Sequence, residues 1–75
     1  MAGGAGLVYV RHALRRIEER GISQEEVERV VLESRLILPG TGGGPKRRRY
    51  VHEVGGRRIS VVLDLPNIVI TAYVI

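Results

Sequence analysis

The chain contains no cysteine, no tryptophan and no phenylalanine. The absence of cysteine excludes disulfide bonds, thiolate metal sites and a thiol nucleophile. Only two histidines are present and no carboxylate stands at ligand spacing from them, so we expect neither a metal nor a cofactor. The shortage of aromatic residues argues against a sheet that stacks nucleic-acid bases on aromatic rings.

Long hydrophobic runs are also missing, and no stretch is long enough to span a membrane. The glycine-rich opening lacks the basic and apolar regions of a signal peptide and is expected to be a disordered leader over residues 1–6. We therefore expect one cytoplasmic domain over residues 7–75 with no membrane contact. A chain of 75 residues buries a thin core, so stabilisation by a partner or a second copy is consistent with its size.

Positive charge is abundant but unevenly placed. The formal net charge is +4, and 11 of the 12 basic residues are arginine. Residues 1–45 hold six arginines and six glutamates, so the whole excess lies in residues 46–75. Arginine suits bidentate contact with phosphate, which favours a nucleic-acid partner. The same bias towards arginine is also typical of a thermophilic protein.

Two amphipathic helices are predicted in the first half. Apolar residues recur at helical spacing over about 11–20, and Gly21 is typical of the residue that ends a helix. Ser23 followed by Glu26 predicts a capping box at the start of a second helix over about 24–34. The segments 7–10 and 36–38 have extended character.

The second half predicts strands. The glycine-rich segment within 39–45 lacks the Gly-Lys-Ser/Thr of a phosphate-binding loop and is interpreted as a linker. Strands are expected at about 46–54, 57–64 and 68–75, with Gly55-Gly56 as a two-residue hairpin turn. The predicted fold is α+β, with two helices packed on a three-stranded antiparallel meander (ααβββ) in two layers.

The hairpin turn fixes a register, and the register assigns side chains to faces. Val54 should pair with Arg57, His52 with Ile59 and Tyr50 with Val61. A tight second turn would place Ile70 beside Leu63 and Ala72 beside Val61. The face towards the helices would then carry Tyr50, His52, Val54, Ile59, Val61, Leu63, Ile70, Ala72 and Val74. The open face would carry Arg47, Arg49, Val51, Glu53, Arg58, Ser60, Val62, Asp64, Thr71 and Tyr73.

A sheet face rich in arginine could lie along a phosphate backbone. The same charges could instead protect an edge strand from aggregation, or form the cross-strand pairs Glu53–Arg58 and Arg47–Asp64. The residues predicted to bind nucleic acid are Arg20, Lys46, Arg47, Arg48, Arg49, Arg57 and Arg58.

Proton transfer needs a different set of groups. His12, Arg16 and Arg20 stand four residues apart on the first helix and form a row. On the open sheet face, arginine beside Tyr73 is suited to cleaving a phosphodiester by its neighbouring 2′-hydroxyl, because arginine stabilises the charge on phosphorus oxygens. The candidate catalytic residues are His12, Arg16, Arg49, Arg58 and Tyr73. Structural roles are the alternative, with His12 capping the helix or lining the seam between helix and sheet, and Tyr73 packing at a sheet end.

The order of these motifs resembles a known family. The chain carries His12-Ala13, Arg16 and Arg20-Gly21-Ile22-Ser23, followed by a Leu-Pro loop, a basic strand, a Gly-Gly-Arg hairpin and a last strand with tyrosine. In this order the motifs resemble the small prokaryotic domain-of-unknown-function family 4258 over about residues 9–75. The layout is also similar to toxins of the BrnT and, more distantly, RelE/ParE types. That resemblance implies a RelE/BrnT-like sandwich whose sheet handles RNA and which an antitoxin neutralises. By position it points to His12, Arg16 and Arg20, to the hairpin Gly55-Gly56-Arg57, and to Arg49, Arg58 and Tyr73.

These observations predict a toxin-like protein that binds RNA, and a metal-free ribonuclease is the enzyme activity that we consider for it. The alternative is a non-catalytic interaction module that binds a second copy or an antitoxin-like protein. A third interpretation is a stable domain whose charge serves solubility alone.

Overall fold

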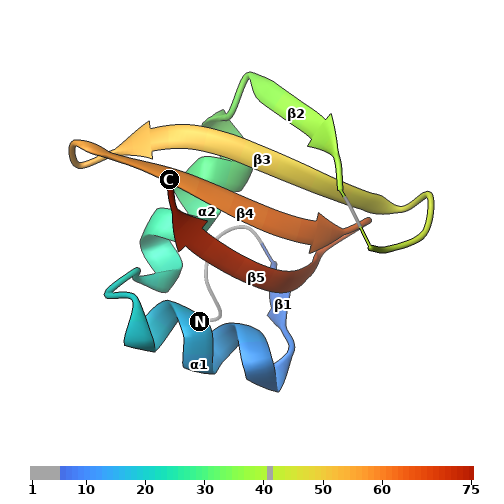
Figure 1. The fold of residues 1–75 in the computed structure, drawn as a ribbon, viewed down its shortest axis with the longest axis horizontal. Helices are drawn as coiled ribbons and strands as arrows, with labels where there is room; N and C mark the ends of the chain where they lie inside the picture. The colour runs from blue at the N-terminus through green and yellow to red at the C-terminus, as the bar shows by residue number, and fades with distance from the viewer. Residues whose placement is uncertain (1–5, 41) are drawn as a thin grey trace.

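The computed structural model describes residues 6–40 and 42–75. Its elements follow one another as β1 (Val8–Tyr9), α1 (Arg11–Glu19), α2 (Gln24–Glu33), β2 (Leu36–Pro39), β3 (Arg47–Val54), β4 (Arg57–Asp64) and β5 (Ile68–Val74). Both helices lie on one side of a single sheet (Figure 1). The leader expected over 1–6 falls almost entirely outside the described residues, as does Thr41 of the expected linker.

The sheet has five strands in the order β1-β5-β4-β3-β2, and β1 runs parallel to β5. The predicted three-stranded meander, and with it the RelE/BrnT-like ααβββ sandwich, is therefore wrong. The two extra strands are the segments in which the sequence indicated only extended character. Their pairing depends on contacts far along the chain, such as the bond from Val8 N–H to the Asn67 carbonyl at 2.9 Å, which local periodicity does not reveal.

Each helix begins and ends for a local reason. Ser23 and Glu26 form the predicted capping box, with the Glu26 N–H donating to Ser23 Oγ at 3.1 Å and the Ser23 N–H donating to Glu26 Oε1 at 2.8 Å. Between the helices, Gly21 has a φ of 66°, the left-handed conformation that glycine adopts without a steric cost. No helix in the two described stretches is long and apolar enough to cross a membrane.

The β3–β4 register confirms the predicted pairs of Val54 with Arg57, His52 with Ile59 and Tyr50 with Val61. The β4–β5 register keeps Val61 opposite Ala72 but places Val69 opposite Leu63. The predicted neighbour Ile70 is wrong, because the turn uses the three residues 65–67 and the register shifts between Val62 and Leu63. Val69 is consequently the buried residue at that point.

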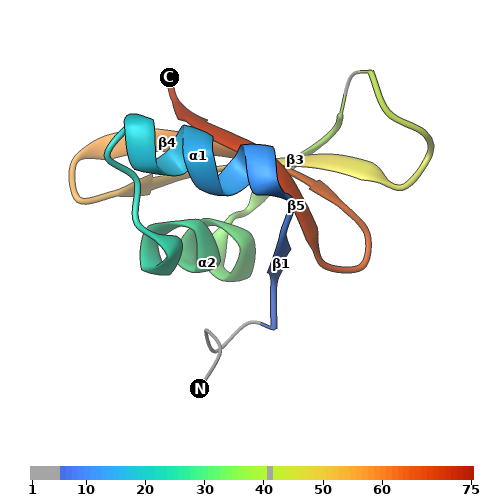
Figure 2. The same cartoon turned by 90° about the horizontal axis from the view of Figure 1, so that it is seen from below.

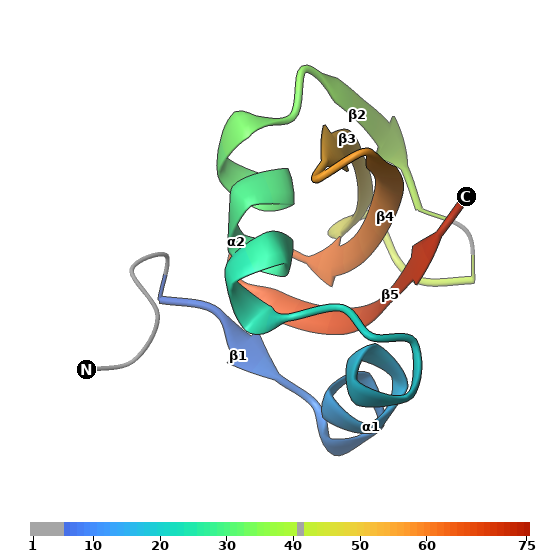
Figure 3. The same cartoon turned by 90° about the vertical axis from the view of Figure 1, so that its left-hand side faces the viewer.

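The core lies between the helices and one face of the sheet. Helix α1 packs mainly on β5, whereas α2 packs on β3 and β4 (Figure 2). The sheet curves around α2 (Figure 3), and the buried residues form one cluster. That cluster consists of Ala13, Ile17, Ile22, Val27, Val30, Tyr50, Val54, Ile59, Val61, Leu63, Val69 and Ala72. Within residues 6–40 and 42–75, no helix covers the opposite face of the sheet (Figure 2).

Candidate functional site: an arginine–tyrosine cluster on the open face

Tyr73 occupies the open face of β5 and is contacted by a side chain from a strand two positions away. Arg49 of β3 reaches across β4, and its Nη1 donates to the Tyr73 hydroxyl oxygen at 3.3 Å. Between them, on β4, Ser60 is the cross-strand partner of Tyr73. The alternation of side chains along three adjacent strands therefore assembles one polar group from residues spread over 25 positions of sequence.

Arg20 joins this group from the other layer. It lies at the C-terminal end of α1, and its Nη1 donates to the Ala72 carbonyl at 2.8 Å and to Thr71 Oγ1 at 3.4 Å. The bond to Ala72 occupies a carbonyl on the outer edge of β5, which caps part of that edge. We call Arg20, Arg49, Ser60, Thr71 and Tyr73 the arginine–tyrosine cluster.

The cluster favours negative charge at the phenol. Ser60, the largest contributor, lowers the pKa of Tyr73 below its ordinary value, and Arg49 and then Arg20 lower it further. Together they outweigh burial, which raises it. Ser60 is the cross-strand neighbour of Tyr73, and within the described part of the chain its fully buried Oγ has no hydrogen-bond partner at ordinary geometry. A buried hydroxyl without a partner is costly, and solvent does not reach this oxygen in the folded domain.

A hollow of about 240 Å³ opens beside the cluster. It is lined by Arg49 and Tyr73 and, on its other sides, by Leu38, Pro39, Gly40 and Val62. Its cationic wall suits an oxyanion such as phosphate, and its apolar wall suits a flat or aliphatic group next to that anion. Among the described residues, no group of three histidine, cysteine or carboxylate side chains is placed to bind a metal ion.

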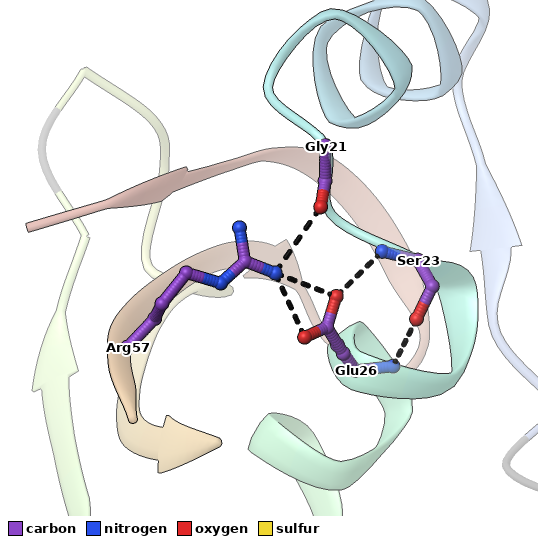
Figure 4. A network of polar contacts seen from close by, with 4 residues as sticks. All are labelled: Gly21, Ser23, Glu26 and Arg57. Carbon is purple, nitrogen blue, oxygen red and sulfur yellow. Dashed lines mark hydrogen bonds and ion pairs between the residues drawn. The ribbon is translucent and has the colours of Figure 1, made fainter. Parts of the chain in front are cut away.

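Two of the predicted nucleic-acid contacts are occupied within the fold. Arg57 donates from Nη2 to both carboxylate oxygens of Glu26, at 2.9 and 2.8 Å, and to the Gly21 carbonyl at 3.1 Å. Figure 4 shows how this ties the β3–β4 turn to the start of α2 through the capping box. The positive charge of Arg57 is therefore paired with Glu26, and this contact holds the helical layer to the sheet.

Arg47 has a similar structural role at the other end of the hairpin. Its Nε and Nη2 donate to the two oxygens of Asp64 at 2.8 and 3.1 Å, which is the expected cross-strand pair. This contact lowers the pKa of Asp64. A Cβ at Gly40 or Gly43 would overlap the Arg47 side chain, so the absence of a side chain at these two positions lets their backbone approach Arg47.

The remaining predicted residues of the sheet differ in their surroundings. Arg48 lies on the helix side of β3, opposite Leu63, and donates to the Pro45 and Arg47 carbonyls. Lys46 lies in the turn that precedes β3. Arg58 is exposed on the open face and lines a second hollow with Glu53 and His52. Arg58 and Glu53 are Cα partners, but their side chains form no ion pair in the described structure.

The structure does not bring His12 and Arg16 to the cluster. Both are exposed on α1, where Arg16 pairs with Glu19 at 3.4 Å. His12 lines a small hollow with Arg11 and Arg15, and no described contact links it to Tyr73. The predicted register puts Ser60 on the open face, but the sequence alone assigns it no role. The signal that marks it is a single polar residue between Ile59 and Val61 in an otherwise apolar stretch.

The match to a family model covers nearly all of this architecture. The model described as Domain of unknown function (DUF4258) matches residues 9–74. The chain belongs to the DUF4258 family. This confirms the resemblance noted in the sequence, and it leaves the activity to be argued from the site. No curated protein and no solved structure matches the chain. The DUF4258 match spans both helices and the whole arginine–tyrosine cluster.

Proposed function

We propose that this domain binds RNA on the open face of its sheet, with the arginine–tyrosine cluster and Arg58 as the contacts. The observation that carries the proposal is the bond between Arg49 and Tyr73 in a region where no described carboxylate forms an ion pair with Arg20, Arg49 or Arg58. Arginines without anionic partners retain their full attraction for phosphate.

The distribution of arginines that already form ion pairs with carboxylates supports this choice of face. Glu26 and Asp64 neutralise Arg57 and Arg47, so the positive excess of residues 46–75 is carried by Lys46, Arg48, Arg49 and Arg58 against Glu53. Arg49 and Arg58 are the two of these arginines on the open face, and Arg20 adds a third charge from α1. Electrostatic contact with a phosphate backbone is strongest where such charges share one surface.

A hydroxyl group in the cluster favours RNA over DNA. The Tyr73 hydroxyl, which lines the hollow, provides an oxygen that can accept a bond, and the ribose 2′-hydroxyl is the donor that distinguishes the two nucleic acids. A face made only of guanidinium groups would contact phosphates alone.

Binding is tested with fluorescence anisotropy of a labelled single-stranded RNA, and of DNA of the same sequence, at several salt concentrations. We expect affinity to fall steeply with salt, with the slope reduced by about one for each lost phosphate contact in Arg49→Ala and Arg58→Ala. Arg15→Ala is the matched control, because it removes an equally charged side chain from the exposed surface of α1. If Arg15→Ala lowers the RNA affinity as much as Arg49→Ala does, the attraction depends on total charge and not on the open face. No binding at low salt would refute the proposal.

A second candidate function is cleavage of the bound RNA without a metal. The observation that favours it is the lowered pKa of Tyr73 beside Arg49, because a larger fraction of the phenol is then ionised near neutral pH and able to accept the 2′-hydroxyl proton. The 2′-oxygen would bond to phosphorus to give a 2′,3′-cyclic phosphate, the bond to the 5′-oxygen would break, and that oxygen would take its proton from water. Arg49 would stabilise the charge on the non-bridging phosphorus oxygens during this step. Cleavage that persists in EDTA, and that Tyr73→Phe abolishes while RNA affinity remains, is the expected result. Intact RNA after incubation with the wild-type chain would exclude cleavage and leave binding.

A further inference from the structure

The hollow beside the arginine–tyrosine cluster lies over one row of side chains on the open face. Leu38 of β2, Arg49 of β3 and Val62 of β4 are successive cross-strand partners, so their side chains leave the sheet on the same face and next to one another. Arg49 bends out of this row, because its Nη1 reaches the hydroxyl of Tyr73 in the next row along the strands. The hollow is therefore polar at the guanidinium and the phenol, and aliphatic where Leu38 and Val62 line it.

The two kinds of lining together match the two chemical parts of one nucleotide. Among the described residues, no carboxylate forms an ion pair with Arg49, so its guanidinium is able to bind a phosphate through two parallel hydrogen bonds. The flat, apolar face of a base can cover Leu38 and Val62, and burial of these side chains favours binding. The volume of about 240 Å³ lies just below the range of about 300–1,000 Å³ typical of pockets for drug-sized ligands, which suits one base and not a base pair.

The shape of the sheet disfavours a duplex. The sheet curves around α2, so its open face is convex (Figure 3). A rigid duplex contacts a convex surface over a narrow area, and its bases are stacked and paired inside, where they cannot cover the aliphatic lining. A single strand is flexible enough to follow the curve and can turn one base out of its stack.

A second arginine lies at a distance that suits the same strand of RNA. Arg58 precedes Val62 by four residues on β4, which corresponds to about 14 Å at about 3.4 Å per residue. Both residues lie on the open face, and Arg58 is exposed there. Arg58 is therefore too far from the hollow to share the phosphate bound by Arg49, and is placed for the phosphate of a different nucleotide.

We infer that the hollow binds one unpaired nucleotide of a single-stranded RNA. The phosphate of this nucleotide contacts Arg49 beside Tyr73, and its base covers Leu38 and Val62. Arg58 contacts another phosphate of the same strand. The inference rests on the proposed function, RNA binding by the open face, and adds that the domain selects single strands over duplexes.

Competition experiments on the full chain test the inference with changes in the RNA alone. A labelled single-stranded RNA without self-complementarity is displaced by the same unlabelled strand, by its duplex, or by a strand of equal length whose sugars carry no bases. Charge alone predicts that the duplex competes best, because it carries more phosphates for the same length. We expect the opposite, with the duplex and the abasic strand each at least about fivefold weaker than the intact strand.

The outcomes separate this inference from the proposed function. If the duplex or the abasic strand competes as well as the intact strand, the nucleotide site is wrong and RNA binding stands. If none of the three binds at low salt, the proposed function fails and the inference fails with it.

Leu38→Ser tests the position of the base. It should weaken binding of the intact strand at least about threefold and leave the affinity for the abasic strand unchanged, because it removes apolar lining and no charge. Ile37→Ser is the matched control, since Ile37 is the adjacent residue of β2, is 50% exposed and lies on the helix side. Equal losses in the two variants, or a loss that is as large for the abasic strand, would overturn this placement of the base.

Discussion

Replacing Glu26 by glutamine is predicted to destabilise the domain at neutral pH, because Glu26 connects the helical layer to the sheet. Its carboxylate accepts the Ser23 N–H at 2.8 Å and binds Arg57 Nη2 through both oxygens. Glutamine keeps one oxygen for the capping box but removes the charge that holds Arg57. The loss therefore falls on the link between α2 and the β3–β4 turn.

The magnitude follows from the exposure of the pair. A hydrogen bond to a charged group contributes about 1.5–3 kcal/mol when shielded from water. Here the side chains are 23% exposed for Glu26 and 35% for Arg57, so solvent screening reduces this contribution. We expect Glu26→Gln to cost about 1 kcal/mol, equivalent to about 4–8 °C in melting temperature for a domain of this size. Arg57→Met should cost a similar amount, and a double-mutant cycle should give a coupling energy of about 1 kcal/mol.

The effect must also depend on pH in a defined direction. The backbone hydrogen bond from Ser23, followed by the bond from Arg57, lowers the pKa of Glu26. A carboxylate with a lowered folded pKa adds stability above its unfolded pKa of about 4.5, and this stability disappears as the pH falls through the folded value. The gap between wild type and Glu26→Gln should therefore be full at pH 7 and should narrow in acid below the unfolded pKa.

Urea unfolding followed by circular dichroism at pH 7 and in acid measures both effects. Glu19→Gln is the control, since Glu19 and Arg16 form an ion pair whose side chains are about half exposed, and it should change stability by less than about 0.5 kcal/mol. A coupling energy near zero in the cycle, or a gap that does not change with pH, would refute the reasoning.

Three further changes probe the core, the tyrosines and the hairpin turn. Leu63→Ala removes a fully buried side chain and should cost about 2–5 kcal/mol in urea unfolding, whereas Leu36→Ala at the half-exposed edge should cost about 1 kcal/mol or less. In a spectrophotometric titration Tyr73 should ionise before Tyr9, because burial and Glu28 raise the pKa of Tyr9 to about 12 whereas the pKa of Tyr73 is lowered. Tyr73→Phe should remove the earlier of these two phases and leave the later one. Gly56→Ala should lower stability by about 1 kcal/mol, because Gly56 has a φ of 80° that alanine adopts only under strain.

Local signals predicted the parts of the fold that local interactions determine. The Gly55-Gly56 turn has positive φ at both positions, which fixes the β3–β4 register, and that register is the predicted one. Ser23 and Glu26 likewise form their capping box within a single turn of helix. Where a turn has no such constraint the prediction failed: the three residues 65–67 and the shift after Val62 exchange the places of Val69 and Ile70.

The edge strands show a different limit. The sequence indicated extended conformation near Val8 and in Leu36–Pro39, but extended residues acquire strand partners only after the chain has folded. Here β1 depends on the arrival of β5 from the far end of the sequence, and β2 depends on the return of β3 past the glycine-rich segment. Such pairings are properties of the whole chain. For this reason the sequence predicts only a three-stranded meander where the structure has a five-stranded mixed sheet.

For the candidate site, the sequence supplied the number of charges but not their partners. The basic run from Lys46 to Arg49 and the pair Arg57-Arg58 look equivalent as sequence, yet Arg47 and Arg57 hold carboxylates within the fold while Arg49 and Arg58 remain on the open face. A substitution at Arg57 would reduce any measured RNA affinity by loosening the helices, without any contact to RNA. Variants of Arg49 and Arg58 are therefore the ones that separate recognition from folding, provided that their unfolding free energies remain those of the wild-type chain.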